Sequence, residues 1–500
     1  MKKCITILLT VLTLINIIPT SVLAAEAEPT VVAQGSCGEN AMWTLTDDGH
    51  IAVTGSGEME CYSFDSTHRT PLFDVREQVL TASVENGITT IGDGFFLGCE
   101  SLQSVEIPES VTLIGEYAFY CCYSMASIKI PENVTEIGYR AFERCKTLDN
   151  VIIPDSVTKL GMSVFSRCEN LKSVKLSDNI TILDNCLFAY CGALESIEIP
   201  ESVTEIHTQA FLKTGFKSFS ITEGVTKIEN SVFEECEKLE YLYIPSTVKD
   251  FGLTSANEAT IVDCPVLTTI EVSPENPYYT VVDGVVFTKD MKTLVYYPEG
   301  LNNTSYTIPD GTETIGAGAF FGNMKLTEVI MPDTITTIKQ KAFKEAETIE
   351  RVQLSKNIKI IEHRAFKQNL SLKEIELPDT LEIIEESAFL WCEALETITL
   401  PGKIKFLPDQ LFYGCVNLKE VVILNPECGF YSNKVVPEHT TITSYPNGET
   451  HRNTRIYGKT FKNIETGEVT EYVLDNQTFM DLLPTENIVA GAPVSMSTLP

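Results

Sequence analysis

The chain has 500 residues, of which 69 are acidic and 37 basic, and its formal net charge is −32. Such an excess of negative charge repels nucleic acid and anionic membrane surfaces, so the sequence favours neither as a partner. The length alone would suggest several domains, but the repeats described below replace that expectation.

The first 24 residues have the pattern of a secretory signal peptide. Lys2 and Lys3 precede an apolar run over residues 5–18, and small residues follow at a cleavage position. An uncleaved membrane anchor is the alternative, but Pro19 ends the apolar run early. No later segment reaches the roughly 18–20 apolar residues of a membrane helix. We therefore expect an exported protein, secreted or at the cell surface, with no transmembrane segment after signal removal.

A β-hairpin is expected next, before any repeat begins. Residues 25–34 are predicted to be a linker and residues 35–87 an N-terminal β cap. In this cap two alternating segments, 41–46 and 50–54, flank the turn sequence Asp47-Asp48-Gly49. A terminal coil of a repeat array exposes its interior, so a cap is needed at this place.

A strict 23-residue period then dominates the sequence. Leucine, isoleucine, phenylalanine and proline positions all keep the same spacing. The period is clearest in the cysteines at Cys99, Cys122, Cys145, Cys168 and Cys191. A period of this length with Leu-x-x-Val-x-Ile inside it is typical of a leucine-rich-repeat solenoid. The predicted fold is a repeat solenoid of about 13 units of 23 residues, mainly short β-strands with helical turns, capped at both ends.

The energetics of one unit explain why it repeats. Apolar residues such as Val134 and Phe142 each contribute about 1.5–3 kcal/mol when buried. Ordering the backbone costs about 1–2 kcal/mol per residue, which is more than one unit recovers alone. Stacking adds a buried interface between neighbouring units, so the array is stable while a single unit is not.

The repeats divide into two runs separated by an irregular region. We expect repeats 1–7 over residues 88–247, an irregular repeat with a β-hairpin island over 248–311, and repeats 9–13 over 312–424. A C-terminal cap over 425–462 and a tail over 463–500 complete the predicted organisation. The island is expected to project from the array, with its hairpin turn around Asp290.

The cysteines have two interpretations. Those at the repeat position fit buried free thiols, since Thr214, Asn323, Ala346 and Asn369 replace them there. Disulfides between stacked positions are the alternative, although the Cα–Cβ bonds of stacked cysteines would be parallel and their Cβ atoms too far apart to bridge easily. Cys37 and Cys61 lie outside the repeats of an exported chain, and are the candidates for a structural disulfide.

The repeat, the leading segment and the island together resemble one known family. The unit Gly-x-x-Ala-Phe-x-x-Cys-x-x-Leu-x-x-Val-x-Ile-Pro is similar to the repeat of BspA-type leucine-rich-repeat surface proteins. Residues 36–45 resemble the leading cap of bacterial members, and residues 279–298 resemble the island between their repeats. The resemblance covers roughly residues 35–460. It implies surface display and binding to host proteins, matrix or other cells.

Of three classes of function, a binding module for a protein or glycan ligand is favoured, because the array offers a long exposed strand face. Its contact patch is predicted at Tyr241, Tyr243, Tyr278, Tyr279, Tyr296 and Tyr297, since aromatic side chains supply much of the energy at interfaces. The alternative is that the island tyrosines only pack the hairpin onto the array. A passive spacer or surface-coat element is the second function, and it shares every fold prediction with the first.

An enzyme is the least favoured class. The chain lacks the His-Glu-x-x-His motif of metalloproteases, the Gly-x-Ser-x-Gly elbow of serine hydrolases and a Gly-rich phosphate loop. Its six histidines are scattered along the sequence. We therefore predict no catalytic residues, no cofactor and no metal site.

Overall fold

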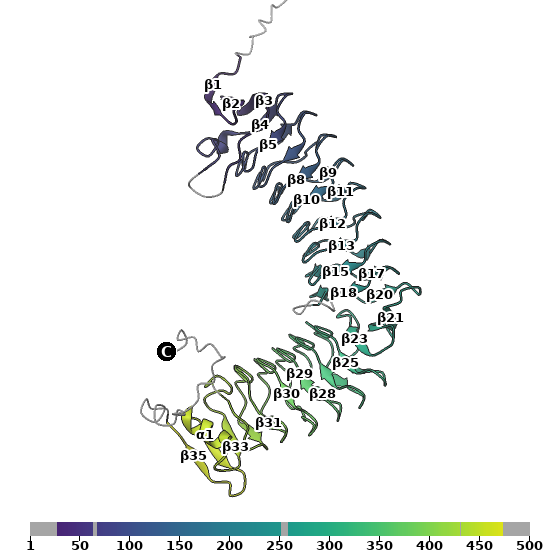
Figure 1. The fold of residues 1–500 in the computed structure, drawn as a ribbon, viewed down its shortest axis with the longest axis vertical. Coiled ribbons are helices and arrows are strands. Elements are labelled where there is room, and N and C mark those ends of the chain that lie inside the picture. Colours follow the sequence, from purple (N-terminus) through teal and green to yellow (C-terminus); the bar gives the residue numbers. More distant parts are fainter. Residues whose placement is uncertain (1–27, 64–67, 252–258, 431, 474–500) are drawn as a thin grey trace, which may run out of the picture.

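The protein is a curved solenoid of about 16 turns of about 23 residues, which confirms the predicted fold class. The computed structural model describes residues 28–473 apart from 64–67, 252–258 and 431. The predicted signal peptide, residues 1–24, lies outside this part of the chain. Figure 1 shows the coils stacked along an arc, with both capped ends on the same side of it.

Two ladders of short parallel strands run along the array. We call them the outer and inner ladders, because the first lies nearer the outside of the arc and the second nearer the inside (Figure 1). The outer ladder comprises β4 (Thr81–Val84), β6 (Ser104–Glu106), β9 (Asn150–Ile152), β11 (Ser173–Lys175), β14 (Ser218–Ser220), β17 (Tyr241–Ile244), β20 (Thr269–Val272), β24 (Ser305–Thr307), β26 (Glu328–Ile330), β28 (Arg351–Gln353), β31 (Thr397–Leu400) and β32 (Glu420–Ile423).

The inner ladder is built from two-residue strands. They are β5 (Thr90–Ile91), β7 (Leu113–Ile114), β8 (Glu136–Ile137), β10 (Lys159–Leu160), β12 (Ile182–Leu183), β13 (Glu205–Ile206), β15 (Lys227–Ile228), β18 (Asp250–Phe251), β25 (Thr314–Ile315), β27 (Thr337–Ile338), β29 (Ile360–Ile361) and β30 (Ile383–Ile384). Within each ladder most register partners lie 23 residues apart, as Val174 does from Val151. Val151 is buried between two exposed neighbours, because side chains alternate across a strand.

The Ala-Phe-x-x-Cys segment, predicted as a helical turn, instead forms consecutive turns bonded to the next coil. Tyr117 and Cys121 adopt left-handed φ angles of 55° and 61°. The amide of Phe119 donates to the carbonyl of Ala141 at 2.8 Å, and that of Cys121 to Glu143 at 2.9 Å. An isolated helical turn would leave these groups without partners, whereas the stacked coil supplies them. We call the left-handed position before each cysteine the turn column.

The core is a continuous stack of phenylalanine rings flanked by the cysteines. Phe142 lies parallel to Phe119 and Phe165, with ring centroids 5.2 Å and 5.7 Å away. The Cys145 thiol donates to the carbonyl of Phe119 at 3.3 Å, and Cys168 to Phe142 at 3.2 Å. Burial raises the pKa of both thiols. The cysteines at the repeat position, such as Cys145 and Cys168, are therefore free, buried hydrogen-bond donors.

The N-terminal cap starts earlier than predicted. β1 (Val31–Ser36) pairs antiparallel with β2 (Asn40–Thr46), so part of the predicted linker 25–34 belongs to the cap. β2 pairs in turn with β3 (His50–Ser56), which gives the hairpin expected from the Asp-Gly turn. A short 3-10 helix, Arg76–Gln78, precedes β4. This sheet covers the first coil, because β3 pairs with β4 and β4 with β6.

The C-terminal cap reaches beyond its predicted end at residue 462. β33 (Thr441–Ser444) continues the outer ladder, and helix α1 (Glu449–Ile456) follows it. β34 (Thr460–Asn463) pairs antiparallel with β35 (Val469–Glu471). Residues 463–471 of the predicted tail therefore belong to the cap, and residues 474–500 lie outside the described part of the chain.

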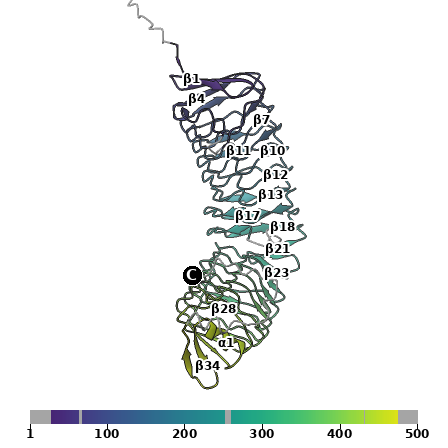
Figure 2. The ribbon, with the colours of Figure 1, turned by 60° about the vertical axis from the view of Figure 1, so that its left-hand side comes forward.

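The island is part of the array rather than a projection from it. β21 (Tyr279–Val282), β22 (Val285–Thr288) and β23 (Thr293–Tyr296) form the expected antiparallel strands. β23 then pairs parallel with β25, which joins the island to the inner ladder. Two further short strands, β16 (Phe233–Glu234) and β19 (Ile261–Val262), pair just before it. Figure 2 shows the coils before and after the island inclined to each other.

Candidate binding surface

The outward positions of the outer ladder form the exposed strand face predicted from the sequence. At its centre β17 lies between β14 and β20, with Tyr243 opposite Ser220 on one side and Glu271 on the other. The Tyr241 hydroxyl donates to Glu271 Oε2 at 2.8 Å. Desolvation, followed by this carboxylate, raises the pKa of Tyr241 to about 12. Tyr241 is therefore neutral at pH 7, and both tyrosines are half-buried side chains within a solvent-facing row.

Three of the six predicted contact tyrosines are core residues. Tyr279, Tyr296 and Tyr297 are buried, because the island strands pack into the array. The Tyr279 hydroxyl donates to the carbonyl of Lys249 at 3.0 Å. For these three residues the structure contradicts a recognition role and agrees with the packing alternative. Tyr278 is 42% exposed and lies with Lys289 on a separate surface beside the island hairpin.

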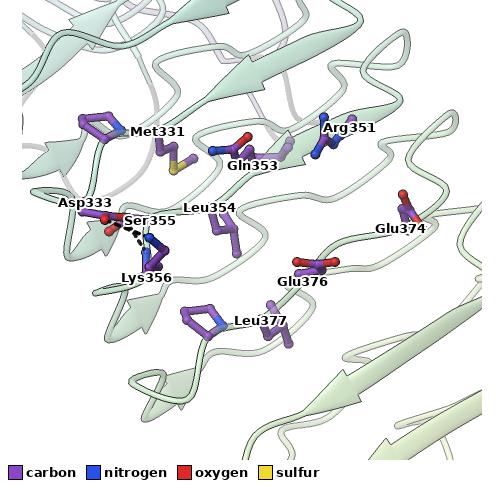
Figure 3. Close-up of a pocket in the computed structure, with 13 residues that line it drawn as sticks. Met331, Asp333, Arg351, Gln353, Leu354, Ser355, Lys356, Glu374, Glu376 and Leu377 are labelled. Carbon is purple, nitrogen blue, oxygen red and sulfur yellow. Dashed lines mark hydrogen bonds and ion pairs between the residues drawn. The ribbon is translucent and has the colours of Figure 1, made fainter.

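A cleft that the sequence did not reveal opens farther along the same strand face. It has a volume of about 600 Å³ and is lined by three successive coils, as Figure 3 shows. The cleft arises where the coil at residues 374–377 leaves the ladder: β28 keeps a single bridge, from Arg351 to Glu374. In the preceding coil the amide of Met331 donates to Gln353 at 3.0 Å. Among the described residues, the Leu354 amide makes no matching backbone hydrogen bond to the next coil.

The cleft is lined by exposed charged side chains and by more buried apolar ones. Arg351 pairs with Glu328 at 3.0 Å, and Lys356 with Asp333 at 3.4 Å. The apolar part of the lining comes from Met331, Leu354, Leu377 and two prolines. Glu374 and Glu376 have no ion-pair partner among the described residues, and both are exposed. The arrangement offers hydrogen-bonding groups of both charges to a ligand.

The predicted disulfide is not formed. Cys37 and Cys61 are both free thiols in the structure. Cys37 is fully buried in the cap, where burial raises its pKa to about 12, whereas Cys61 is exposed. The two side chains therefore occupy different environments, even though the amide of Glu60 donates to the carbonyl of Cys37 at 2.7 Å.

The titratable side chains that most resemble catalytic groups belong to structural networks. His207 lies 3.3 Å from Asp184 and 3.2 Å from Glu205, and both carboxylates stand on the inner ladder side. His50 contacts the hydroxyls of Thr81 and Ser83. In the described part of the chain no three histidine, cysteine or acidic residues are grouped to hold a metal ion. Of the described helices, none combines the length and apolarity needed to cross a bilayer.

Known structures share this architecture. A leucine rich cell surface protein from Faecalibacterium prausnitzii is 26% identical, with 80% of this chain and 96% of that chain covered and a TM-score of 0.53. The pneumococcal vaccine antigen PcpA is 19% identical over 89% of this chain and 99% of that chain, with a TM-score of 0.47. A leucine-rich repeat protein from Bacteroides ovatus is 22% identical over 81% and 98%, with a TM-score of 0.41.

No curated protein matches the chain. The family model for the BspA type leucine rich repeat region matches residues 72–194, 136–262 and 295–425, which together exceed half of the chain. The period, the stacked coils and this match agree, so the chain belongs to the BspA-type leucine-rich-repeat family.

Proposed function

We propose that the protein is an exported binding module, secreted or held at the cell surface, that adheres to a protein or glycan ligand outside the cell. The observation that carries this proposal is the exposed strand face, with Tyr241 and Tyr243 at its centre and the cleft of Figure 3 farther along it. The similar F. prausnitzii protein is described as a cell surface protein, which supports the same location.

Of these two features, the pair Tyr241 and Tyr243 is the stronger candidate for a binding hot spot. Each ring offers a large, rigid surface with a polar tip, which is the side-chain type enriched in binding hot spots. Tyr241 is already oriented by its bond to Glu271, so little conformational entropy is lost when a ligand covers it. The neighbouring strand β14 carries Ser218 and Ser220 at the paired positions, which provides a matched control.

A ligand array tests the proposal. The purified chain is applied to immobilised collagen, fibronectin, laminin, mucin and glycans, and to intact cells. We expect retention on at least one of these surfaces, and at least a tenfold loss of affinity for Tyr241→Ala/Tyr243→Ala. The control Ser218→Ala/Ser220→Ala should bind as the unchanged protein does. Retention on none of the surfaces would favour a passive spacer, and equal binding by both double variants would refute the tyrosine patch.

A further inference from the structure

An acidic pocket lies where the coils before the island meet the coils after it. Its volume is about 290 Å³, and it lies apart from the strand face. Its lining brings together residues far apart in the sequence, among them Glu235, Asp263, Glu299, Gly322, Met324 and Lys325. The Tyr241 surface contributes none of these residues.

The pocket exists because the turn column carries a glycine, Gly322, at this place. Glu235 and Asp263 occupy this column with left-handed φ angles of 52°, and Gly322 occupies it with a φ of 64°. A Cβ atom at Gly322 would lie 2.7 Å from Asp263 Oδ1 and 3.7 Å from Glu299 Oε1. The glycine thus leaves a space onto which two carboxyl groups from different coils converge.

Glu299 forms the base of this space. Its side chain is buried, with only 4% of the residue exposed, and its Oε1 atom has no hydrogen-bond partner among the residues that the structure describes. Burial raises the pKa of Glu299 to about 8, although the nearby backbone of Cys264 and Asp263 acts in the opposite direction. A buried carboxyl oxygen without a partner costs free energy that a bound donor would recover.

The charged groups that face the two carboxyls include more acidic than basic residues. Burial, followed by the charge of Glu345, raises the pKa of Asp263 to about 6. The charged and titratable groups around Asp263 and Glu299 are Glu234, Glu235, Glu345, Lys344, Lys325, Cys264 and Tyr296. Lys325 is engaged elsewhere, because its Nζ donates to the carbonyl of Gly300 at 2.7 Å and to Asn302 Oδ1 at 3.1 Å.

The size and lining of the pocket indicate which kind of cation it fits. A bare metal ion needs several converging oxygen ligands, and the described residues show no group of three such side chains. The volume is about ten times the roughly 30 Å³ that one water occupies in the liquid. Pro265 and Met324 add apolar surface at the rim, which suits the methylene stem of a long cationic side chain.

We propose that this pocket binds the cationic end of a lysine or arginine side chain presented by a partner polypeptide. The ammonium or guanidinium group donates to Glu299 Oε1 and Asp263 Oδ1, and its stem lies against Pro265 and Met324. The pocket is thus a second contact site, whose specificity comes from charge rather than from the aromatic surface.

Binding must be linked to proton release. At pH 7 Glu299 is largely protonated, and a cation is held by the ionised form. Lysine stays charged up to about pH 10, so affinity rises with pH as Glu299 ionises. With a pKa of about 8, the ionised fraction and hence the affinity increase by about tenfold between pH 7 and pH 9.

Titration calorimetry on the purified full chain tests the proposal. The probes are a capped Gly-Lys-Gly peptide, its arginine counterpart, and its norleucine counterpart as an uncharged control. We expect saturable binding of the two cationic peptides only, and proton release at pH 7 when buffers of different ionisation enthalpy are compared. Glu299→Gln should weaken lysine binding at least tenfold, because the amide keeps the shape but not the charge.

Filling the pocket is the complementary test. Gly322→Ala should abolish lysine binding, since its Cβ occupies the space beside Asp263. Gly98→Ala is the matched control: it shares the turn column and a positive φ of 73°, but its Cβ would meet only Arg76, at 3.5 Å. Binding that ignores the lysine charge, or survives in Gly322→Ala, would overturn the proposal. Calcium chloride that binds through Glu299 and displaces the peptide would overturn it in favour of a metal site.

Discussion

The phenylalanine stack predicts a large and local cost for one substitution, Phe142→Ala. Phe142 is fully buried, and its ring lies within 5° of parallel to both neighbours, Phe119 and Phe165. A buried Phe→Ala change costs about 3–5 kcal/mol through lost transfer free energy and the cavity that remains. Each stacked pair contributes about 0.5–1.5 kcal/mol beyond burial, so we expect a cost at the upper end of the Phe→Ala range, about 4–5 kcal/mol.

A second position in the same stack sharpens this expectation. Phe412 is equally buried, but among the described residues it stacks only on Phe389, at 5.7 Å. Phe412→Ala should therefore cost about 1 kcal/mol less than Phe142→Ala, since one stacking partner is lost rather than two. Val416, which is 58% exposed, is the surface control, and Val416→Ala should stay within about 0.5 kcal/mol.

Denaturant unfolding followed by circular dichroism gives the loss of stability, and amide hydrogen exchange gives its location. Each coil contacts only its neighbours, so protection should fall most in the coils that carry Phe119, Phe142 and Phe165. A loss for Phe142→Ala no greater than that of Val416→Ala would refute the reasoning. So would a uniform loss of protection along the whole array, since it would mean that the coils are not stabilised by nearest neighbours.

Two other outcomes follow from the buried titratable groups. In the folded protein Cys61 should react first with a thiol reagent, and the cysteines at the repeat position should react only after unfolding. The reason is that burial shields thiols such as Cys168 and raises their pKa. A non-reducing mass spectrum with a Cys37–Cys61 bridge would contradict this expectation. Glu299 has a folded-state pKa of about 8, above its unfolded value, so its contribution to stability is present at low pH and is lost as the pH rises through 8. Urea midpoints should show Glu299→Gln gaining stability over the unchanged protein between pH 5 and pH 8.5, and parallel midpoints would exclude this burial effect.

The 23-residue spacing was sufficient to predict the solenoid and its stacked positions. Val151 and Val174 pair in the expected register, because a fixed period places equivalent residues beside one another in any stacked fold. The sequence also indicated that the cysteine position needs a small side chain. It did not reveal why threonine and asparagine replace cysteine: Thr214 and Asn369 also donate to phenylalanine carbonyls, those of Phe211 and Phe343.

The tyrosines of the island show the limit of the period. Tyr296 and Tyr297 lie in a segment without the repeat, where alternation alone does not reveal whether a hairpin projects or joins the array. Their burial depends on the pairing of β23 with β25, a contact that no local pattern specifies. The same holds for Glu299, whose partner Gly322 acts through the absence of a side chain in another coil.

Curvature links the fold to the places where a ligand can bind. The inner ladder is nearly continuous and forms sheets of four, four and seven strands, the last of which includes the island. The outer ladder between the caps is divided into shorter sheets of two, three and three strands. Coils that fan around an arc are farther apart on its outer side, and backbone bonds require a strand spacing of roughly 4.8 Å. The outer ladder is therefore the one in which we expect pairing to be interrupted. The cleft at residues 374–377 lies at such a break, between β28 and β31. A substitution that straightens the array should therefore close the cleft without altering any residue that lines it, which separates the contribution of shape from that of side-chain chemistry.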